Sequence, residues 1–215
     1  MKHIALLTTL LLSASLQAVE KPYDYVFFEN SLMKGDYFYS QAKYTSPSWI
    51  KNARHHLPVA GSVAFTPGNS LELTYVSAPG GDWYSEIQYC PVRGNDFFRE
   101  PSTLSMQVRL RESMNAAALP NIAIRYADST YTQYLNLRNY LKDTRPGVWH
   151  PVSIPLEDFG LNAVNDTNIK KLAAVALRPG TADGNEYTIY LDDIELLPAS
   201  LPSVSALNAP VLQEA

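Results

Sequence analysis

Apolar and polar residues alternate in many short segments of this chain. Between Ser70 and Val76 every second residue, starting at Leu71, is apolar, and the residues between them include Glu72 and Thr74. The alternation recurs along 83–90, 103–111, 121–128 and 131–140, and strand-like runs follow at 149–156, 172–180 and 186–196. A period of two gives a strand one apolar and one polar side. The pattern predicts an all-β fold, a two-sheet antiparallel β-sandwich of the jelly-roll type.

The composition supports this prediction and limits the partners. Hydrophobic residues make up 46% of the 215 residues, which is enough for a packed core. Only 18% are charged, whereas 14 residues are tyrosine, a balance typical of β-sheet proteins. The 17 basic and 21 acidic residues give a net charge of −4, which argues against a nucleic-acid partner.

Residues 1–18 have the organisation of a secretory signal peptide. Lys2 and His3 precede the apolar run 4–12, and small and polar residues lead to Ala18. The apolar run is too short to cross a bilayer as a helix, and no second long apolar stretch follows. We therefore expect cleavage after Ala18, no membrane span in the mature protein, and a secreted or periplasmic location. The alternative is an uncleaved N-terminal anchor.

The mature chain divides into one domain and a tail. Residues 19–198 form the predicted β-sandwich domain. Residues 199–215 are typical of a linker or a disordered tail, because they combine small residues, proline and serine without periodicity. Such a segment could connect the domain to a partner enzyme. The single cysteine, Cys90, has no partner for an internal disulfide, and we expect a buried, inert thiol.

Three segments resemble parts of a known family. In 149–160, WHPVSIPLEDFG, a tryptophan opens a strand, Ile-Pro-Leu closes it, and an acidic-Phe turn follows. Segment 187–196, YTIYLDDIEL, resembles the closing strand of the same fold, and 27–38, FFENSLMKGDYF, its opening strand. Together they resemble non-catalytic carbohydrate-binding modules of the galactose-binding-like β-sandwich type. The resemblance implies a polysaccharide or oligosaccharide partner, and we expect Trp149 in the core.

The resemblance also implies a structural Ca²⁺ ion. Such modules often hold calcium between an acidic residue of the first strand and an aspartate of the last, and the matching positions are Glu29 and Asp192. Asn30 and backbone carbonyls near Gly35 would supply further oxygens, of which calcium takes about six to eight. The alternative is that Asp192 and Asp193 only end the strand in solvent.

The polar sides of the alternating segments are the first candidate for a glycan-binding surface. If those strands share one sheet, they bring to its outer face Tyr84, Glu86, Gln88, Gln107, Arg109, Arg125, Tyr134, Asn136 and Arg138. Planar side chains stack on the C–H faces of sugars, and Arg, Asn, Gln and Glu hydrogen-bond to neighbouring hydroxyls. The arginines would also suit an acidic polysaccharide. The alternative is an ordinary solvated face, on which we would expect more lysine.

Two loops are the second candidate. The segment PGGDWYSE places Trp83 just after two glycines, and RGNDFFREP carries Arg93 and Phe97. An exposed tryptophan on a glycine-rich loop would stack on a sugar ring. The alternative is that Trp83 and Phe97 close the end of the sandwich.

A polysaccharide lyase or a glycoside hydrolase built on a jelly roll is the alternative function. The chain has no GxSxG, P-loop or HExxH motif, and nothing fixes the separation of carboxylates such as Glu86 and Asp96. A lyase built on a jelly roll would use residues such as Tyr134, Arg138 and His56 to abstract a proton beside a uronate. A structural or adhesive surface protein would show no concentrated polar and aromatic patch. We expect carbohydrate binding without catalysis.

Overall fold

The computed structural model describes residues 25–89, 101–161 and 172–198, so the predicted signal peptide, the tail and Cys90 lie outside the described residues. The strands, in chain order, are β1 (Tyr25–Phe28), β2 (Asp36–Tyr37), β3 (Ser40–Thr45), β4 (Trp49–Ile50), β5 (Leu57–Ala60), β6 (Ser70–Val76), β7 (Asp82–Gln88), β8 (Pro101–Leu110), β9 (Asn121–Tyr126), β10 (Leu135–Asn136), β11 (Trp149–Pro155), β12 (Leu172–Arg178) and β13 (Glu186–Pro198). Three short 3-10 helices are η1 (Ala116–Ala118), η2 (Leu137–Asn139) and η3 (Leu156–Phe159).

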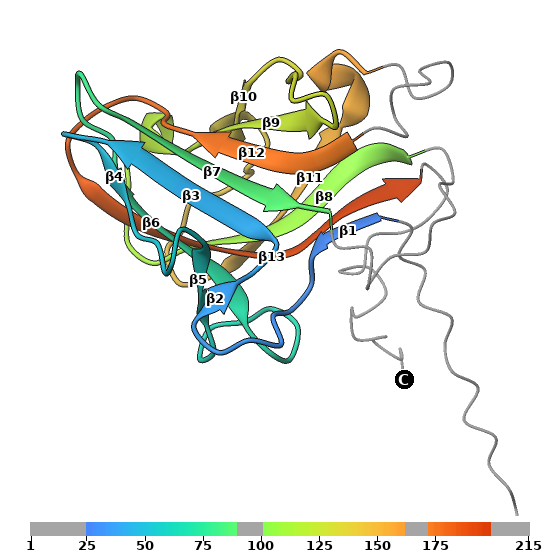
Figure 1. Cartoon of the computed structure of the whole chain (residues 1–215), viewed down its shortest axis with the longest axis horizontal. Coiled ribbons are helices and arrows are strands. Elements are labelled where there is room, and N and C mark those ends of the chain that lie inside the picture. Colours follow the sequence, from blue (N-terminus) through green and yellow to red (C-terminus); the bar gives the residue numbers. More distant parts are fainter. Residues whose placement is uncertain (1–24, 90–100, 162–171, 199–215) are drawn as a thin grey trace, which may run out of the picture.

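These strands form two antiparallel sheets that are packed as two layers (Figure 1). The eight-stranded sheet has the order β11-β8-β13-β6-β5-β2, with β1 paired to β13 and β4 paired to β6. The five-stranded sheet has the order β10-β9-β12-β7-β3. Most neighbouring strands are far apart in the sequence, because the chain crosses repeatedly between the two layers. The predicted all-β sandwich is confirmed.

The core lies between the sheets and is built from the apolar positions of the alternating segments. Leu71 and Tyr75 of β6 are fully buried, and so are Ile122 and Ile124 of β9 in the opposite sheet. The Tyr75 hydroxyl donates a hydrogen bond to the carbonyl of Ala118 at 3.0 Å, so its polar tip is satisfied inside the core. The residues between these apolar positions consequently face outward and form the two outer faces of the sandwich.

A β-bulge in β13 changes which residues face the core. Leu191 is buried in the core before the bulge, and Ile194 is buried there after it. The alternation shifts at Asp193, which has a left-handed φ of 47°. The register with β8 shifts at the same place. Asp192 therefore lies on the outer face of the eight-stranded sheet and not on the side of Ile194.

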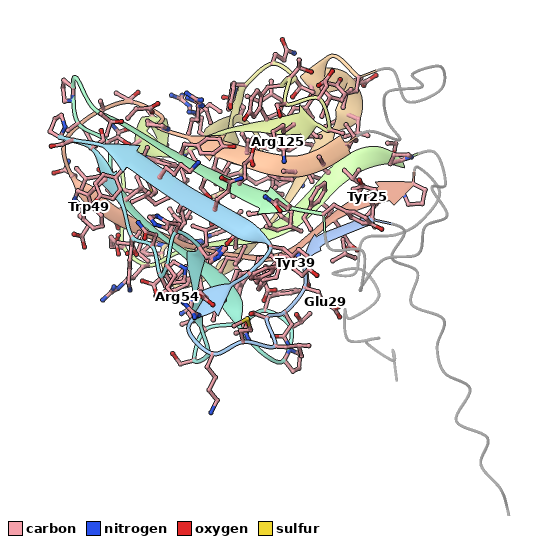
Figure 2. All side chains as sticks on the ribbon, in the orientation of Figure 1. Tyr25, Glu29, Tyr39, Trp49, Arg54 and Arg125 are labelled. Carbon is pink, nitrogen blue, oxygen red and sulfur yellow. The ribbon has the colours of Figure 1, made fainter. Side chains whose placement is uncertain are left out.

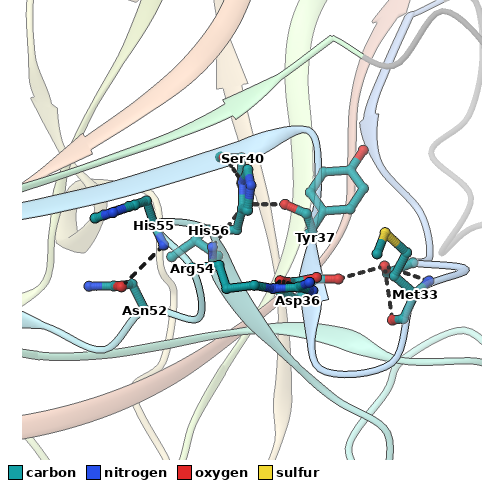
Figure 3. A network of polar contacts seen from close by, with 10 residues as sticks. Met33, Asp36, Tyr37, Ser40, Asn52, Arg54, His55 and His56 are labelled. Atoms are coloured by element: carbon teal, nitrogen blue, oxygen red, sulfur yellow. Dashed lines mark hydrogen bonds and ion pairs between the residues drawn. The ribbon is translucent and has the colours of Figure 1, made fainter.

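The edge strand β2 is tied to the turn between β4 and β5 by a polar network (Figure 3). Arg54 and His55 have left-handed φ values of 53° and 69°, which cost about 1–2 kcal/mol per residue in side chains other than glycine. The buried Asp36 carboxylate accepts hydrogen bonds from Nε and Nη2 of Arg54 at 3.0 and 2.7 Å. His56 contacts the Ser40 carbonyl through Nδ1, so its ring is fixed beside β3.

Candidate functional site

The outer face of the five-stranded sheet has a floor of small side chains. The register of β12 places Ala176 beside Glu86 of β7 and Ala123 of β9, and it places Ala174 beside Arg125 of β9. Directly opposite residues of antiparallel strands point to the same face, so three alanines occupy its centre. All three are fully buried although they face away from the core. Larger side chains of the neighbouring strands therefore cover them.

Three tyrosines and an arginine lie over this floor. The rings of Tyr131 and Tyr134, from the connection between β9 and β10, are stacked with their centroids 6.1 Å apart. The Arg178 guanidinium lies 5.5 Å from the ring centre of Tyr84 and 5.7 Å from that of Tyr134, within the range of cation–π attraction. Arg178 Nε donates to the Tyr134 hydroxyl at 3.2 Å. The hydroxyls of Tyr84 and Tyr131 are 3.1 Å apart, so these side chains hold one another in place.

A buried carboxylate connects the rings to a second arginine. Glu86 is 1% exposed, and its Oε1 lies 2.6 Å from Nε of Arg125 in an ion pair. The same oxygen accepts a hydrogen bond from the Tyr131 hydroxyl at 3.1 Å, and Oε2 accepts one from Nε2 of Gln41 at 2.9 Å. A carboxylate without access to water needs such partners. Glu86 thereby fixes side chains from β3, β9 and the β9–β10 connection.

The second arginine of this face is also paired. Arg178 Nη1 lies 3.3 Å from Oδ2 of Asp82, and both side chains are about half exposed. Arg125 and Arg178, the described arginines on this face, therefore each have a carboxylate partner. Figure 2 labels Arg125 on β9, in the five-stranded layer. We define the tyrosine face as the group Tyr84, Glu86, Arg125, Tyr131, Tyr134 and Arg178.

The hydroxyls of Tyr84 and Tyr134 are held in their protonated form. Burial is the main cause that raises the pKa of Tyr84, and its hydrogen bond to the Glu86 carboxylate raises that pKa further. Burial also raises the pKa of Tyr134, against the opposing effect of Arg178. Such phenols act as hydrogen-bond donors and acceptors rather than as bases. With 37% of Tyr131 and 36% of Tyr134 exposed, the face combines accessible ring surface with polar groups, as sugar recognition requires.

The sequence predicted four members of the tyrosine face. Tyr84, Glu86, Arg125 and Tyr134 come together on one outer face, as the alternation indicated. Gln88 lies on the same face, opposite Ala174 at the end of β7. Whether these residues bind a ligand stays a prediction at this point.

Four residues that complete this arrangement were not predicted: Gln41, Asp82, Tyr131 and Arg178. Arg178 follows Ala174 and Ala176 at a spacing of two, so the alternation of β12 contained a signal for it. Tyr131 lies outside the regular strands, and an isolated bridge to Arg125 brings it to the face. In the predicted alternation of 131–140, Tyr131 falls on the side of Leu135 and Leu137, so the pattern did not mark it as an outward residue.

Trp83 is a core residue, which corrects its interpretation as an exposed platform. Its side chain is fully buried, its ring centre lies 4.7 Å from that of Tyr75, and Nε1 donates to Ser77 Oγ at 2.9 Å. The preceding turn packs closely against the β3–β4 connection, because a Cβ atom on Gly81 would lie 2.2 Å from the backbone nitrogen of Ser48. β7 starts directly after this turn, and its alternation directs Trp83 inward.

Arg109 lies on the other sheet, which corrects its expected place beside Arg125. Its strand, β8, pairs with β11 and β13, so Arg109 and Gln107 point away from the tyrosine face. Alternation shows which residues share a side of a strand, but it does not show which sheet the strand joins. Trp149 lies directly opposite Arg109, and it is half-buried on the outer face rather than in the core.

The remaining ligand candidates have other surroundings. The Asn136 side chain donates to Asn121 Oδ1 at 3.0 Å and accepts from the Arg138 backbone at 3.0 Å, so it stabilises the start of η2. Arg138 is exposed on η2. Arg93, Asp96 and Phe97 lie outside the described residues.

The structure separates the residues of the lyase alternative. Tyr134 directly precedes β10, at one edge of the five-stranded sheet. His56 contacts Ser40 of β3, at the opposite edge. Four strand spacings of about 4.8 Å lie between these edges. The two side chains therefore do not converge on one reacting atom.

Asp192 is buried, but both oxygens of its carboxylate already accept hydrogen bonds from backbone N–H groups. Oδ2 accepts hydrogen bonds from the N–H groups of Phe65 at 2.7 Å and Thr66 at 3.3 Å, and Oδ1 accepts one from Asp193 at 2.9 Å. Burial raises the pKa of Asp192 to about 7. Its visible role is to fasten the loop 61–69 onto the outer face of the eight-stranded sheet.

Oxygen atoms near this loop and the β13 bulge lack hydrogen-bond partners within the described residues. These atoms are Oδ1 of Asn30, Oδ2 of Asp193 and Oε2 of Glu195. Burial raises the pKa of Asp193 to about 6 and that of Glu195 to about 8, and the carboxylate of Glu29, labelled in Figure 2, adds to both shifts.

Carboxylate and amide oxygens of this kind suit a hard cation such as Ca²⁺. Along the described ranges, no group of three or more His, Cys, Asp or Glu side chains is already arranged to hold a metal ion. The donor types therefore fit calcium, although a complete ligand set is not preassembled.

The fold is that of a β-sandwich carbohydrate-binding module. The model of carbohydrate binding domain 30, CBM30, matches residues 24–197, which is most of the 215-residue chain. The chain belongs to the CBM30 family, and carbohydrate binding is its function at the level of class. No helix of the described residues is long and apolar enough to cross a membrane.

Solved structures support the same fold. The family 30 module of the cellulosomal cellulase Cel9D-Cel44B of Clostridium thermocellum has a TM-score of 0.60 and 17% identity, over 82% of this chain and 98% of that one. Another family 30 module has a TM-score of 0.58 and 18% identity, over 83% of this chain and 91% of that one. A family 11 module from Clostridium thermocellum, in complex with a β-1,3-1,4-mixed-linked tetrasaccharide, has a TM-score of 0.52 and 13% identity, over 76% and 91%.

Proposed function

We propose that this protein binds a neutral polysaccharide through the tyrosine face, without catalysing a reaction. The supporting observation is the stacked pair Tyr131–Tyr134 beside arginines that are already neutralised by Glu86 and Asp82. An uncharged sugar leaves these ion pairs intact. An anionic sugar would compete with the two carboxylates for the same guanidinium groups and would be repelled by them.

Recognition combines stacking with hydrogen bonds. The exposed parts of the Tyr131 and Tyr134 rings offer flat surfaces for pyranose C–H groups. The Tyr84 hydroxyl and the guanidinium of Arg178 supply donors at the side of these rings. Because the side chains already hold one another, little side-chain entropy is lost when a glycan binds.

A β-1,3-1,4-linked glucan is the proposed ligand class. The family 11 module of similar fold was solved with a β-1,3-1,4-mixed-linked tetrasaccharide. The exposed rings and paired charges of the tyrosine face are compatible with an extended neutral glucan of this kind.

Affinity electrophoresis in gels that contain mixed-linked β-glucan tests this proposal. We expect the wild-type protein to be retarded, and Tyr131→Ala and Tyr134→Ala each to lose about tenfold in affinity, since a stacked ring contributes about 0.5–1.5 kcal/mol beyond its buried area. Tyr44→Ala is the matched control, because Tyr44 is 55% exposed and lies outside the tyrosine face. Equal retardation of all three variants and the wild type would overturn the proposed surface.

We further propose that Ca²⁺ binds beside the β13 bulge, with Asp193 and Glu195 as ligands together with Glu29. The unpartnered oxygens of Asp193 and Glu195 support these two ligands, and Glu29 is included because its charge acts on both carboxylates. They favour Asp193 over Asp192, whose oxygens accept backbone hydrogen bonds. Bound calcium would supply the positive charge that these buried carboxylates lack, and it would tie β1 to β13.

Thermal unfolding with excess Ca²⁺ or with a chelator tests the calcium site. At calcium concentrations about 100 times the Kd, the wild type should gain about 2.7 kcal/mol of stability. The Asp193→Asn and Glu195→Gln variants should lose this gain. Asp192→Asn should be destabilised in both conditions but keep the gain. A wild-type unfolding temperature that does not respond to Ca²⁺ would contradict the proposal.

We also propose that the protein is exported, on the basis of the signal-like residues 1–18. The family 30 relative from Clostridium thermocellum is a module of a cellulosomal cellulase, which is consistent with an extracellular role. Mass spectrometry of the mature protein should find Val19 at its N-terminus. The connection of residues 199–215 to a partner enzyme stays a prediction.

A further inference from the structure

A row of four side chains crosses the outer face of the eight-stranded sheet, on the side opposite the tyrosine face. Glu72 of β6 lies opposite Tyr190 of β13, Tyr190 lies opposite Arg109 of β8, and Arg109 lies opposite Trp149 of β11. Directly opposite residues are neighbours at about 4.5–5.5 Å between Cβ atoms. All four are half-buried. We define Glu72, Tyr190, Arg109 and Trp149 as the Arg109 row.

Both sides of this row are structurally fixed. On one side the loop 61–69 is fastened to Asp192 by the N–H groups of Phe65 and Thr66, and the ring of Phe65 lies 6.0 Å from that of Trp149 at 70°. On the other side the hydroxyls of Thr74 and Thr188 lie 2.9 Å apart and are buried. The row therefore lies between the loop 61–69 on one side and the small side chains of Thr74 and Thr188 on the other.

The charge of Arg109 distinguishes it from the other arginines on described strands. Arg125 is paired with Glu86, and Arg178 is paired with Asp82. No ion pair joins Arg109 to a carboxylate within the described residues, and this is the difference, because the Nε atoms of Arg109 and Arg125 both lack a hydrogen-bond partner there. The nearest acidic member of the row, Glu72, is already bound to Lys51 at 2.6 Å.

An unpaired guanidinium between two aromatic residues has a defined chemical preference. Its planar fork matches a carboxylate, with two parallel N–H···O hydrogen bonds. Tyrosine and tryptophan rings beside it supply the flat surface on which a pyranose packs. A sugar that carries a carboxylate satisfies both parts at once, whereas a neutral sugar leaves the charge of Arg109 without a partner.

We propose that the Arg109 row is a second saccharide-binding surface, specific for uronate residues of an acidic polysaccharide. The uronate carboxylate binds the terminal nitrogens of Arg109, and the sugar ring packs against Trp149. This surface is separate from the tyrosine face, which takes neutral glycan, so the two ligand classes bind to opposite sides of the sandwich. The protein would then connect a neutral and an acidic polysaccharide.

Affinity electrophoresis in parallel gels, one with polygalacturonate and one with mixed-linked β-glucan, tests this second surface. The wild type should be retarded in both gels, and added salt should weaken only the polygalacturonate interaction, because its ion pair is screened. Arg109→Gln should lose about tenfold in affinity for polygalacturonate, through loss of a charge-assisted bidentate pair, and keep its affinity for β-glucan. Tyr134→Ala should show the reverse pattern.

Arg145→Gln is the matched control, since it removes the same charge from an exposed side chain outside both surfaces. Circular dichroism of Arg109→Gln confirms that the variant is folded. The proposal is overturned if polygalacturonate does not retard the wild type, or if Arg145→Gln weakens that interaction as much as Arg109→Gln. Loss of the polygalacturonate interaction in Tyr134→Ala would also overturn it, because both ligands would then use the tyrosine face. Failure of β-glucan binding alone would affect only the function proposed for that face.

Discussion

The two outer faces of the sandwich use the same residue types but pair them differently. On the five-stranded sheet, Arg125 is matched by the buried Glu86 and lies beside an alanine floor. On the eight-stranded sheet, Arg109 lies between aromatic neighbours, and no described carboxylate pairs with it. Both strands carry an arginine on their polar side. The chemistry of each face therefore depends on the side chains that the neighbouring strands of the sheet bring next to the arginine.

The largest predicted difference is in stability, between substitutions of Trp83 in the core and of Trp149 on the outer face. Trp83→Ala should cost about 3–5 kcal/mol in the free energy of unfolding, because it removes a fully buried ring from the core. Trp149→Ala should cost less than half of that, since Trp149 is half-buried on an outer face. Urea denaturation of both variants measures the difference. Equal losses would show that Trp149 is as much a core residue as Trp83.

The carboxylates of the two faces give the next largest contrast. Glu86→Gln should destabilise the protein by about 2–4 kcal/mol, because it leaves the Arg125 charge without its buried partner. Glu72→Gln should change stability by less than about 1 kcal/mol, since its partner Lys51 is 51% exposed and the pair is screened by solvent. Chemical denaturation at low and high salt separates the two, with a salt effect expected only for Glu72. A small effect of Glu86→Gln would contradict the organising role assigned to this carboxylate.

Enlarging a residue of the alanine floor should have a smaller effect on the free energy of unfolding and a clear effect on glycan affinity. Ala176→Leu should cost about 1–3 kcal/mol, because its added carbons displace the side chains that cover it. The same change should weaken β-glucan binding while polygalacturonate binding is unchanged. Ala176→Ser is the conservative control and should bind both polysaccharides as the wild type does. Isothermal titration calorimetry with both ligands makes the comparison.

The smallest expected effect is that of alkaline pH on the tyrosine face. The pKa values of Tyr84 and Tyr134 are raised mainly by burial, so both phenols stay protonated where free tyrosine, at about 10, would ionise. A pKa that is higher in the folded than in the unfolded state contributes to the free energy of unfolding. This contribution is complete below a pH of about 10 and is lost as the pH rises further. Affinity for β-glucan should accordingly be constant from neutral pH to about 10. A decline within that range, followed by titration calorimetry, would show that an ionising group takes part.

The sequence was sufficient for the fold and for part of the candidate site. Period-two alternation and strand-like runs identified β6–β9 and β11–β13 and the outward direction of Tyr84 and Glu86, because a pleated strand fixes the side on which each residue lies. The strands β3, β4 and β5 were not predicted, and in the predicted run 131–140 only Leu135–Asn136 forms a strand. The segments 149–160 and 187–196 carry enough of the family pattern to indicate a carbohydrate-binding module. Family membership in CBM30 is in agreement with that expectation.

Two kinds of feature were beyond the sequence. The sheet to which β8 belongs depends on long-range pairing, so Arg109 was assigned to the wrong face. The direction of Asp192 depends on a bulge at Asp193, which reverses the alternation that the sequence pattern assumes. Tyr131 was missed for a related reason, since a bridge outside the regular strands brings it to Arg125.

The most direct test of the tyrosine face as the glycan site is a titration of ¹⁵N-labelled protein with a β-1,3-1,4-glucan tetrasaccharide, followed by NMR. Chemical-shift changes should concentrate at the Nε–H groups of Arg125 and Arg178 and at the backbone amides of Tyr131 and Tyr134. The Nε–H signal of Arg109, on the opposite face, should not move. Shift changes confined to Arg109 and its neighbours, with unchanged signals from Arg125 and Arg178, would contradict the assignment of this face.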